Sequence, residues 1–586
     1  MKKNLKKYLF FLLISATMFS CKKDFLNITP MGVINSSSFY NTKSDADQAV
    51  TAIYSTLDYT QCWDLYTMAD LGSISSDDAE AGGDNPDDTY VFQHIDRYDF
   101  TPSEGTCFTE PYGVLYKAIY YANLAIQHLP GIIKTDTTAS PAYINGRIGE
   151  AKFLRALNYF YLAQMFGEVP CFNEVLGASQ YAMGRSSLRN VYDQIEKDLN
   201  DAIAVLPDRG QVDVNDVGRA TKESAEGLLA KVYLFESSYA HYYPSDNNSL
   251  VNKGQSRFAG LKERWADALA MAENVINYGN STGQYQLVGI DGKTYNTWRG
   301  PNTDGFRYVW TTAGNNSPEN VFEVQCEALN LSWLKTRGSS IVWWTGVRWI
   351  LDQKTGKPTE SKMWGFNCPS ASMLAEFNQE PGDPRFNTTI HIAGGNDSIS
   401  YNSGYAKICW NYSPTEWVRT GMYQAKYECS YAEYIKTGNG WGESPFNIRI
   451  LRYADVVLIA AEAAYMLGNN DKALQYINMV RTRARMCGAP GNTVPVNLSG
   501  TVSFQQLVHE RRLELAMEGH RFFDMVRWNM ASKDFKADGT GGFNGQPLAG
   551  GTPSTVTFIS PKNDFFPIPQ SEINTSKGAL TQYPGW

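Results

Sequence analysis

The sequence predicts a mostly α-helical protein in which tetratricopeptide-like helical pairs form a scaffold, interrupted by one loop-rich, Trp-rich insertion. Amphipathic segments recur in both end regions of the chain, with apolar residues three and four positions apart. Many follow one another as helix-turn-helix units with Ala and Gly at close contacts, which is typical of stacked helical pairs. Between about residues 280 and 445, Gly, Asn, Thr, Ser and Pro become frequent and the helical periodicity disappears.

The helical segments follow in order along the chain. The stretch 44–59 places Val50 and Ile53 on one apolar stripe, as expected for a helix with one buried face. The stretch 451–485 divides at Gly468-Asn469-Asn470, because Gly and Asn are typical of a helix end followed by a short turn. Further helices are predicted at 112–130, 149–170, 188–207, 221–240, 263–279 and 504–528.

The N-terminus has the layout of a bacterial lipoprotein signal. Four lysines precede an apolar run from Tyr8 to Ile14, and small residues lead to Cys21. We therefore predict a signal peptide at 1–20, a lipidated Cys21 and a tether at 21–43, with an ordinary secreted chain as the alternative. The most apolar later segment, 454–467, contains Glu462 and is only as long as a buried core helix, so no transmembrane helix is predicted.

Charge and motif content exclude several classes of ligand. The formal net charge of -8 and the pI near 5.5 argue against nucleic acid and anionic membranes, which both need a basic surface. The nine cysteines form no C-x-x-C pair, and the six histidines show no metal-binding spacing. The Gly-rich stretch 539–545 misses the dinucleotide-binding spacing. We expect no metal and no cofactor.

Tryptophan concentrates in the insertion. Of the 14 Trp residues in the chain, ten lie between Trp298 and Trp441. A core takes up only a limited number of indoles, because each ring is bulky and its N–H needs a partner when buried. Aromatic loops on a helical scaffold are common binding sites, so we expect the insertion to carry the ligand site, although a single Trp is more often a core residue.

The stretch 510–528, ERRLELAMEGHRFFDMVRW, is rich in charge and has two interpretations. Glu514 and Asp524 around His520 would suit an acid and a base. These groups lie among apolar residues on a packing helix, however, so we interpret the stretch as architecture. Charges three or four residues apart, such as Arg511 and Glu514, are expected to pair along the helix.

Two carboxylates in the apolar helix at 454–467 need cationic partners. Asp455 and Glu462 would be costly to bury alone. The candidate partners are Arg481, Arg483, Arg511 and Arg512.

Several stretches together resemble the SusD/RagB family of Bacteroidota surface lipoproteins. They are Cys21 with KKDFLNITP, YGVLYKAIYYAN, EAKFLRALNYFYLAQMFGEVP, LRYADVVLIAAEAAYMLGN, ERRLELAMEGHRFFDMVRW and the closing FFPIPQSEINTSKGALTQYPGW. The resemblance covers roughly 21–240 and 445–586 and leaves the middle unmatched. It implies an N-terminal helical region at 44–280, a ligand-binding insertion at 281–445 and a C-terminal helical region at 446–586.

The resemblance also implies a function. Members of this family are lipid-anchored at the outer membrane and face the cell surface. They bind oligo- or polysaccharides and cap a SusC-like TonB-dependent transporter, without catalysis of their own.

A glycan site calls for exposed aromatic planes flanked by polar side chains, because sugars present flat C–H faces and rims of hydroxyls. Trp343 and Trp344 are expected on an extended strand, where their rings would point opposite ways. The candidate platforms are Trp298, Trp310, Trp333, Trp343, Trp344 and Trp364, with Arg307, Arg337 and Arg348 as hydroxyl partners. The early loop 62–90 is a second candidate contributor through Asp77, Asp78 and Tyr90. Its acidic run would alternatively bind calcium, although it lacks the EF-hand spacing.

Two other functional classes stay open. An all-helical glycoside hydrolase would need two carboxylates facing each other across a cleft. A peptide-binding RagB-like lipoprotein would use the same scaffold for another ligand. Release of reducing sugar distinguishes the hydrolase, and binding to glycan or peptide arrays distinguishes the peptide binder.

Overall fold

Helices dominate the molecule, which a computed structural model describes over most of its length. The described residues are 39–58, 68–84, 87–104, 106–297, 300–302, 304–327, 338–361, 363–401, 404–409, 420–428, 430, 444–531, 558–583 and 585–586. The signal peptide and Cys21 lie outside them. No described helix is both long and apolar enough to cross a membrane.

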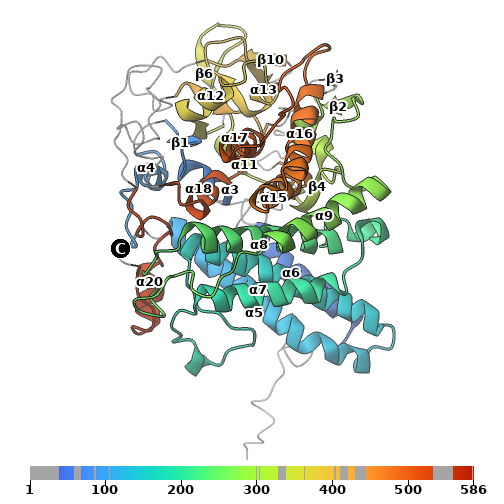
Figure 1. Cartoon of the computed structure of the whole chain (residues 1–586), viewed down its shortest axis with the longest axis vertical. Helices are drawn as coiled ribbons and strands as arrows, with labels where there is room; N and C mark the ends of the chain where they lie inside the picture. Colours follow the sequence, from blue (N-terminus) through green and yellow to red (C-terminus); the bar gives the residue numbers. More distant parts are fainter. Residues whose placement is uncertain are drawn as a thin grey trace, which may run out of the picture.

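Packed helical pairs form the scaffold, and this confirms the predicted fold class. The helices are α2 (Lys43–Leu57), α5 (Thr106–Thr135), α6 (Pro141–Phe166), α7 (Leu188–Ile203), α8 (Lys222–Tyr242), α9 (Trp265–Thr282), α15 (Tyr453–Met466) and α16 (Asn470–Met486). Each helix from α5 to α9 packs on the next, α9 packs on α15, and α15 packs on α16. In Figure 1, α5 to α8 run across the lower half of the molecule, below α15 and α16.

Local sequence explains where these helices begin and which face they bury. Ser140 starts α6, since its hydroxyl accepts from the N–H of Tyr143 at 3.2 Å and Pro141 occupies the first turn. The predicted break after α15 is confirmed, because Gly468 adopts φ +73° and the Asn469 side chain caps α16. The buried residues of α7 lie three or four apart on one face. They are Leu188, Val191, Tyr192, Ile195, Asp198, Leu199 and Ala202.

Short strands tie distant parts of the chain together. Within the described residues the strands form two-stranded antiparallel sheets. The pair β1 (Ala79–Gly82) with β7 (Phe366–Pro369) joins the early loop to the insertion, and β4 (Asn320–Val324) with β12 (Ile448–Arg452) joins the insertion to the start of the C-terminal helical region. The other strands are β2 (Tyr295–Thr297), β3 (Gly300–Asn302), β5 (Trp349–Leu351), β6 (Pro358–Glu360), β8 (Ile390–Ile392), β9 (Ser398–Tyr401), β10 (Gly404–Lys407) and β11 (Met422–Gln424).

Short helices complete the described part of the fold. They are α3 (Met68–Ile74), α4 (Tyr90–Arg97), α10 (Gly305–Val309), α11 (Ile341–Thr345), α12 (Ala371–Phe377), α13 (Phe386–Thr389) and α20 (Gln570–Thr575). Figure 1 places α12, α13, β6 and β10 at the end of the molecule opposite the α5–α8 layer.

The charged stretch 510–528 is not one continuous helix, so the prediction for 504–528 was wrong in its second half. The chain forms α17 (Phe504–Leu515) and α18 (Arg521–Arg527) with a turn between them, where Met517 and Gly519 adopt φ +62° and +78°. The turn is needed because α3 approaches closely: a Cβ on Gly519 would lie 2.6 Å from Cα of Ala69. A side chain at 519 would separate the two segments.

Buried ion pairs join α17 and α18 to α15. Arg511 donates through Nη1 to Asp455 and through Nε to Asp524, each at 2.7 Å. Arg527 donates to Asp524 at 2.8 Å and to Glu462 at 2.7 Å. The predicted pairing of Asp455 with Arg511 is confirmed. The partner of Glu462 is Arg527, which was not among the candidates.

The expected pairing of Arg511 with Glu514 along the helix was wrong. Glu514 accepts from Arg385 and Arg452 at 3.2 Å each and also from Arg483. Burial alone would raise the pKa of Glu514, but the charges of Arg483, Arg452 and Arg385 lower it to about 2. The segments packed around α17 supply charges of opposite sign. The charged side chains of α17 therefore pair with those segments and not along their own helix.

Replacing Arg511 by Ala should therefore destabilise the fold strongly. The substitution leaves two buried carboxylates without their shared cation, which costs about 3–5 kcal/mol. Arg97→Ala is the matched control, since Arg97 pairs with Asp99 at 3.1 Å near the surface, and such pairs contribute about 1 kcal/mol or less. Chemical denaturation measures both; equal midpoints for the two variants would contradict the architectural role.

Candidate functional site

Three of the predicted platform residues form one indole cluster, defined as Trp343, Trp344 and Trp364. The ring centroids of Trp343 and Trp344 are 4.4 Å apart, and Trp364 lies 5.3 Å from the first and 5.1 Å from the second, edge-on to both. The backbone fixes this arrangement, because the N–H of Trp364 donates to the carbonyl of Trp343 at 2.9 Å. Aromatic pairs favour these offset and edge-to-face arrangements.

The rings in this cluster differ in exposure. Trp343 is only 6% exposed, whereas Trp344 and Trp364 are half-buried and pack against the core. The expectation of an extended strand was wrong, since both Trp343 and Trp344 lie on α11, where successive residues are about 100° apart. Trp344 and Trp364 are therefore the cluster members able to touch a ligand.

The early loop meets the insertion beside this cluster. The N–H of Gly83 donates to the carbonyl of Gly365 at 2.9 Å, next to the β1–β7 pair. Gly83 adopts φ +88°, and a Cβ there would lie 2.6 Å from the Phe366 ring. Only glycine permits this approach, which brings the described loop residues 83–84 and 87–90 toward Trp364.

Arg348 supplies the charged edge of the candidate site. It pairs with Asp88 at 3.0 Å and Glu360 at 3.2 Å, lies 3.8 Å from Asp84, and donates to the carbonyl of Trp364 at 3.4 Å. These contacts place a guanidinium and exposed carboxylates beside the indole cluster. Asp84, Asp88 and Glu360 were missed by the sequence interpretation, and the Gly82-Gly83 dipeptide was the available signal for close backbone approach.

Tyr90 is an exposed aromatic residue of the early loop. It is 53% exposed at the start of α4 and packs edge-on against His94 at 5.7 Å. It follows Asp88 by two residues, so the ion pair with Arg348 holds its segment toward the cluster.

Asp77 and Asp78 were expected on an exposed polar loop, and this was wrong. Both are core residues, because they are only 6% and 2% exposed. Arg521 donates to Asp77 at 2.7 Å, and Arg512 donates to Asp78 at 2.8 Å. Burial alone would raise the pKa of Asp77, but the charges of Arg512 and Arg521 lower it to about 2. These carboxylates hold the loop in place and present no oxygen to a ligand.

The calcium alternative finds no arranged site among the described residues. No group of three or more His, Cys, Asp or Glu side chains in that part of the chain could hold a metal ion. Four acids of this run pair with arginines: Asp77 and Asp78 with Arg521 and Arg512, and Asp84 and Asp88 with Arg348.

Two further predicted residues lie in other surroundings. Trp310 is 2% exposed, with Lys426 over its ring at 4.9 Å and Arg452 at 5.3 Å, so it is corrected from platform to core. Arg307, on α10, lies 3.7 Å from Glu428 and donates to the carbonyl of Asn387 on α13. Trp298, Trp333 and Arg337 lie outside the described residues.

Of the candidate catalytic groups, Glu514 and Asp524 are buried and His520 is half-buried. His520 lies 3.2 Å from the ammonium of Lys231. Removal from water lowers the pKa of His520, and the positive charge of Lys231 lowers it further, to about 3.

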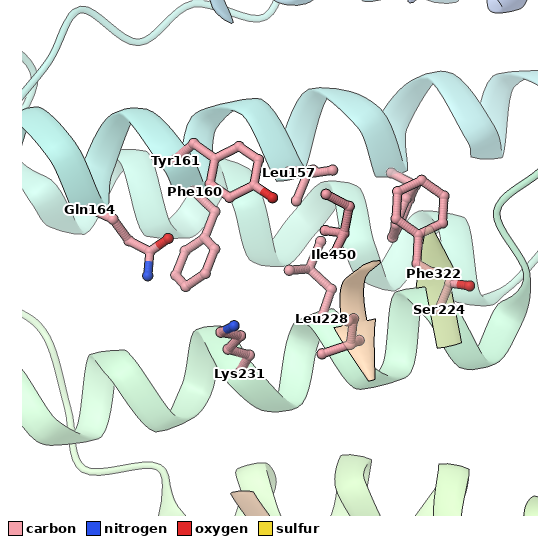
Figure 2. Close-up of a pocket in the computed structure, with 11 residues that line it drawn as sticks. Leu157, Phe160, Tyr161, Gln164, Ser224, Leu228, Lys231, Phe322 and Ile450 are labelled. Atoms are coloured by element: carbon pink, nitrogen blue, oxygen red, sulfur yellow. The ribbon is translucent and has the colours of Figure 1, made fainter. Parts of the chain in front are cut away.

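The cavity in Figure 2 lies between α6 and α8, where the Lys231 side chain points toward Gln164 and Tyr161. Its volume of about 20 Å³ is suited to water rather than to a sugar.

Comparison with known proteins places the chain in a family. Residues 24–234 match the family model described as "Starch-binding associating with outer membrane", and residues 338–586 match that of the SusD family. Together the matches cover most of the chain, which belongs to the SusD/RagB family.

Individual relatives resemble the chain over most of its length. A SusD-like protein of Bacteroides ovatus is 25% identical over 548 residues, covering 89% of this chain and 83% of the relative. The starch-binding protein SusD of Bacteroides thetaiotaomicron is 23% identical over 475 residues, covering 75% and 72%. A solved "Laminarin binding SusD-like protein" is 25% identical with a TM-score of 0.71, covering 93% of this chain and all of that chain.

One solved relative was determined with a sugar. Surface glycan-binding protein A from Bacteroides thetaiotaomicron, in complex with laminarihexaose, has a TM-score of 0.66 at 19% identity and covers 93% of this chain and 100% of that chain. At this level of identity the likeness shows a shared fold.

The close approach at Gly83 yields a prediction about the site's assembly. Gly83→Ala should cost more stability than Gly356→Ala. Both positions have positive φ, so each alanine carries strain of about 1–2 kcal/mol, but the site around Gly356 is open. Only Gly83→Ala also overpacks the Phe366 ring, which adds about 1–3 kcal/mol.

Chemical denaturation followed by tryptophan fluorescence measures this difference. The native-state emission should change for Gly83→Ala alone, because the indole cluster adjoins Phe366. Equal stability of the two variants with unchanged emission would refute the proposed close contact.

Proposed function

We propose that this protein is a cell-surface glycan-binding lipoprotein that captures oligo- or polysaccharide and delivers it to a SusC-like TonB-dependent transporter. The observation that carries the proposal is the indole cluster, whose half-buried Trp344 and Trp364 adjoin Arg348 and its carboxylate partners. The proposed site lies in the insertion 281–445, supported by the early loop. The laminarin and laminarihexaose named for two solved relatives make β-glucans the first ligands to test.

The arrangement suits the surface of a sugar. The C–H face of a pyranose ring packs on an indole plane, and its hydroxyls both donate and accept hydrogen bonds. Arg348 provides donors, while Asp84 and Glu360 provide acceptors at the same edge. The ion pairs among them fix the positions of these groups before a ligand arrives.

Binding without catalysis fits the placement of the acidic groups. Glu514 and Asp524 are buried and already accept from arginines, so neither carboxylate is placed to protonate a sugar oxygen. For the hydrolase alternative, release of reducing sugar from a bound glycan is the discriminating test. For the peptide-binding alternative, it is retention on peptide but not on glycan arrays.

The cellular setting is proposed from the N-terminus and the relatives. The lipoprotein signal at 1–20 with Cys21 supports an anchor in the outer membrane. The description of the family model that residues 24–234 match also names association with that membrane. A single chain anchored in this way would present the insertion to external glycans. The transporter partner is inferred from the family.

Replacing Trp344 and Trp364 by Ala should weaken laminarihexaose binding. Each variant removes aromatic surface that a sugar would bury, worth about 1–3 kcal/mol, and each 1.4 kcal/mol is a factor of ten in affinity. Trp343→Ala should mainly lower the melting temperature, because Trp343 is 6% exposed. Isothermal titration with laminarihexaose and thermal melts measure both effects.

Trp586→Ala is the matched control for these variants. Trp586 is also half-buried but packs against Phe100 and Lys562, away from the site residues. Its affinity should stay unchanged. If Trp344→Ala and Trp364→Ala bind like Trp586→Ala, the indole cluster is not the glycan platform.

Removing the predicted acylation site should release the protein from membranes. Cys21→Ser should yield a folded protein in the soluble fraction, because the variant lacks the acyl chains that would hold the protein stably on a membrane. Fractionation of cells that lack the transporter gives the measurement. Continued sedimentation of the variant with outer membranes would reject lipid anchoring at Cys21.

A further inference from the structure

Two adjoining cavities lie away from the indole cluster. One of about 480 Å³ opens between the C-terminal part of α2, the segment 217–219 and the end of β4. The other, of about 270 Å³, shares Val217, Gly218, Arg219 and Glu323 with the first. Pockets for small ligands typically enclose about 300–1,000 Å³, so the pair is large enough for a fragment of an oligosaccharide.

An amide pair spans the boundary between these cavities. Nδ2 of Asn316 donates to Oε1 of Gln325 at 2.9 Å, and Nε2 of Gln325 donates back to Oδ1 of Asn316 at 3.1 Å. Asn316 lines the smaller cavity and Gln325 lines the larger one. With respect to the described residues, the Asn316 amide keeps one N–H and one lone pair for a ligand, which matches a hydroxyl group that both donates and accepts.

The backbone at Asn316 is held in an unusual conformation. Its φ is +57°, which few residues other than glycine adopt. Arg209 donates to its carbonyl at 2.8 Å, and its N–H donates to the buried carboxylate of Glu323. Strained residues fixed by their surroundings in this way cluster at ligand-binding positions.

A second polar group in the wall lacks a partner. Asn320 is 4% exposed and lines the smaller cavity, and its Oδ1 accepts no hydrogen bond from any described residue. Its Nδ2 is fully engaged, since it donates to Gly314 and Glu323. An unpaired buried acceptor is unfavourable, so the site gains when a donor such as a hydroxyl binds there.

The two guanidinium groups in the walls already have hydrogen-bond partners within the protein. Arg219 pairs with Glu150 and Asp216, each at 2.9 Å, and Arg209 donates to backbone carbonyls. An anionic ligand would thus have to displace these partners to reach either guanidinium. Apolar surface is present as well, because Val217 is 50% exposed and Tyr54 lines the larger cavity.

We propose that the two cavities form a second binding site, which takes a neutral saccharide independently of the indole cluster. Amide groups and the Asn320 oxygen meet the hydroxyls, and Val217 with Tyr54 meets the C–H surface. The inference goes beyond the proposed function, because none of its residues belongs to the insertion's aromatic platform. A chain with two such sites would hold one long glycan at two points and gain avidity.

Blocking the cavity provides the test. Laminarihexaose and maltohexaose are titrated into the Trp344→Ala/Trp364→Ala variant, so that binding at the indole cluster is removed. A residual binding event should remain. Adding Val217→Trp should weaken it at least tenfold, because the indole fills space shared by both cavities.

Val214→Trp is the matched control. Val214 is an exposed valine of the same connection that lines neither cavity, so its replacement should leave the residual binding unchanged. Gln325→Ala, at an exposed position, should weaken the residual binding about three- to tenfold through lost hydrogen bonds. This variant preserves the test if Val217→Trp folds poorly.

The outcomes separate this site from the proposed one. The second site is overturned if neither sugar shows residual binding, or if Val217→Trp and Val214→Trp bind equally while Gln325→Ala has no effect. The proposed function is judged separately, by the loss of affinity when the Trp variants are compared with the intact chain.

Discussion

Two arginines of the C-terminal helices, Arg512 and Arg521, hold the strand on which the candidate glycan site is built. Arg512 donates to Asp78 at 2.8 Å and Arg521 to Asp77 at 2.7 Å. The two aspartates directly precede β1, whose pairing with β7 sets the early loop beside the indole cluster. Because all four groups are buried, loss of either partner would leave an uncompensated charge in the interior.

In this arrangement the stabilising charges and the proposed binding surface belong to different parts of the chain. The buried charges of α17 and α18 pair with each other and with carboxylates of α15, so they position elements without offering groups to a ligand. The half-buried rings of Trp344 and Trp364 lie on a short helix and a loop supported by those elements. Binding residues on loops above a rigid scaffold tolerate change without loss of the fold, which suits a family whose members bind different ligands.

Sequence reasoning predicted the scaffold well because helical periodicity is a local property, and α15 and α16 divide at the glycine where the pattern breaks. It was less successful where partners come from distant segments. Arg527 as the partner of Glu462 and the burial of Asp77 follow from tertiary packing, which spacing along the chain does not encode.

The same limit applies to the candidate site. Composition identified the Trp-rich insertion and three members of one cluster, but Trp310 resembles them in sequence and lies in the core.

The most direct measurement of the central claim is a crystal structure of the protein with laminarihexaose. The account predicts sugar rings stacked on Trp344 and Trp364 with hydroxyls at Arg348. A sugar seated against Glu514, His520 or Asp524, with the indole cluster empty, would contradict it.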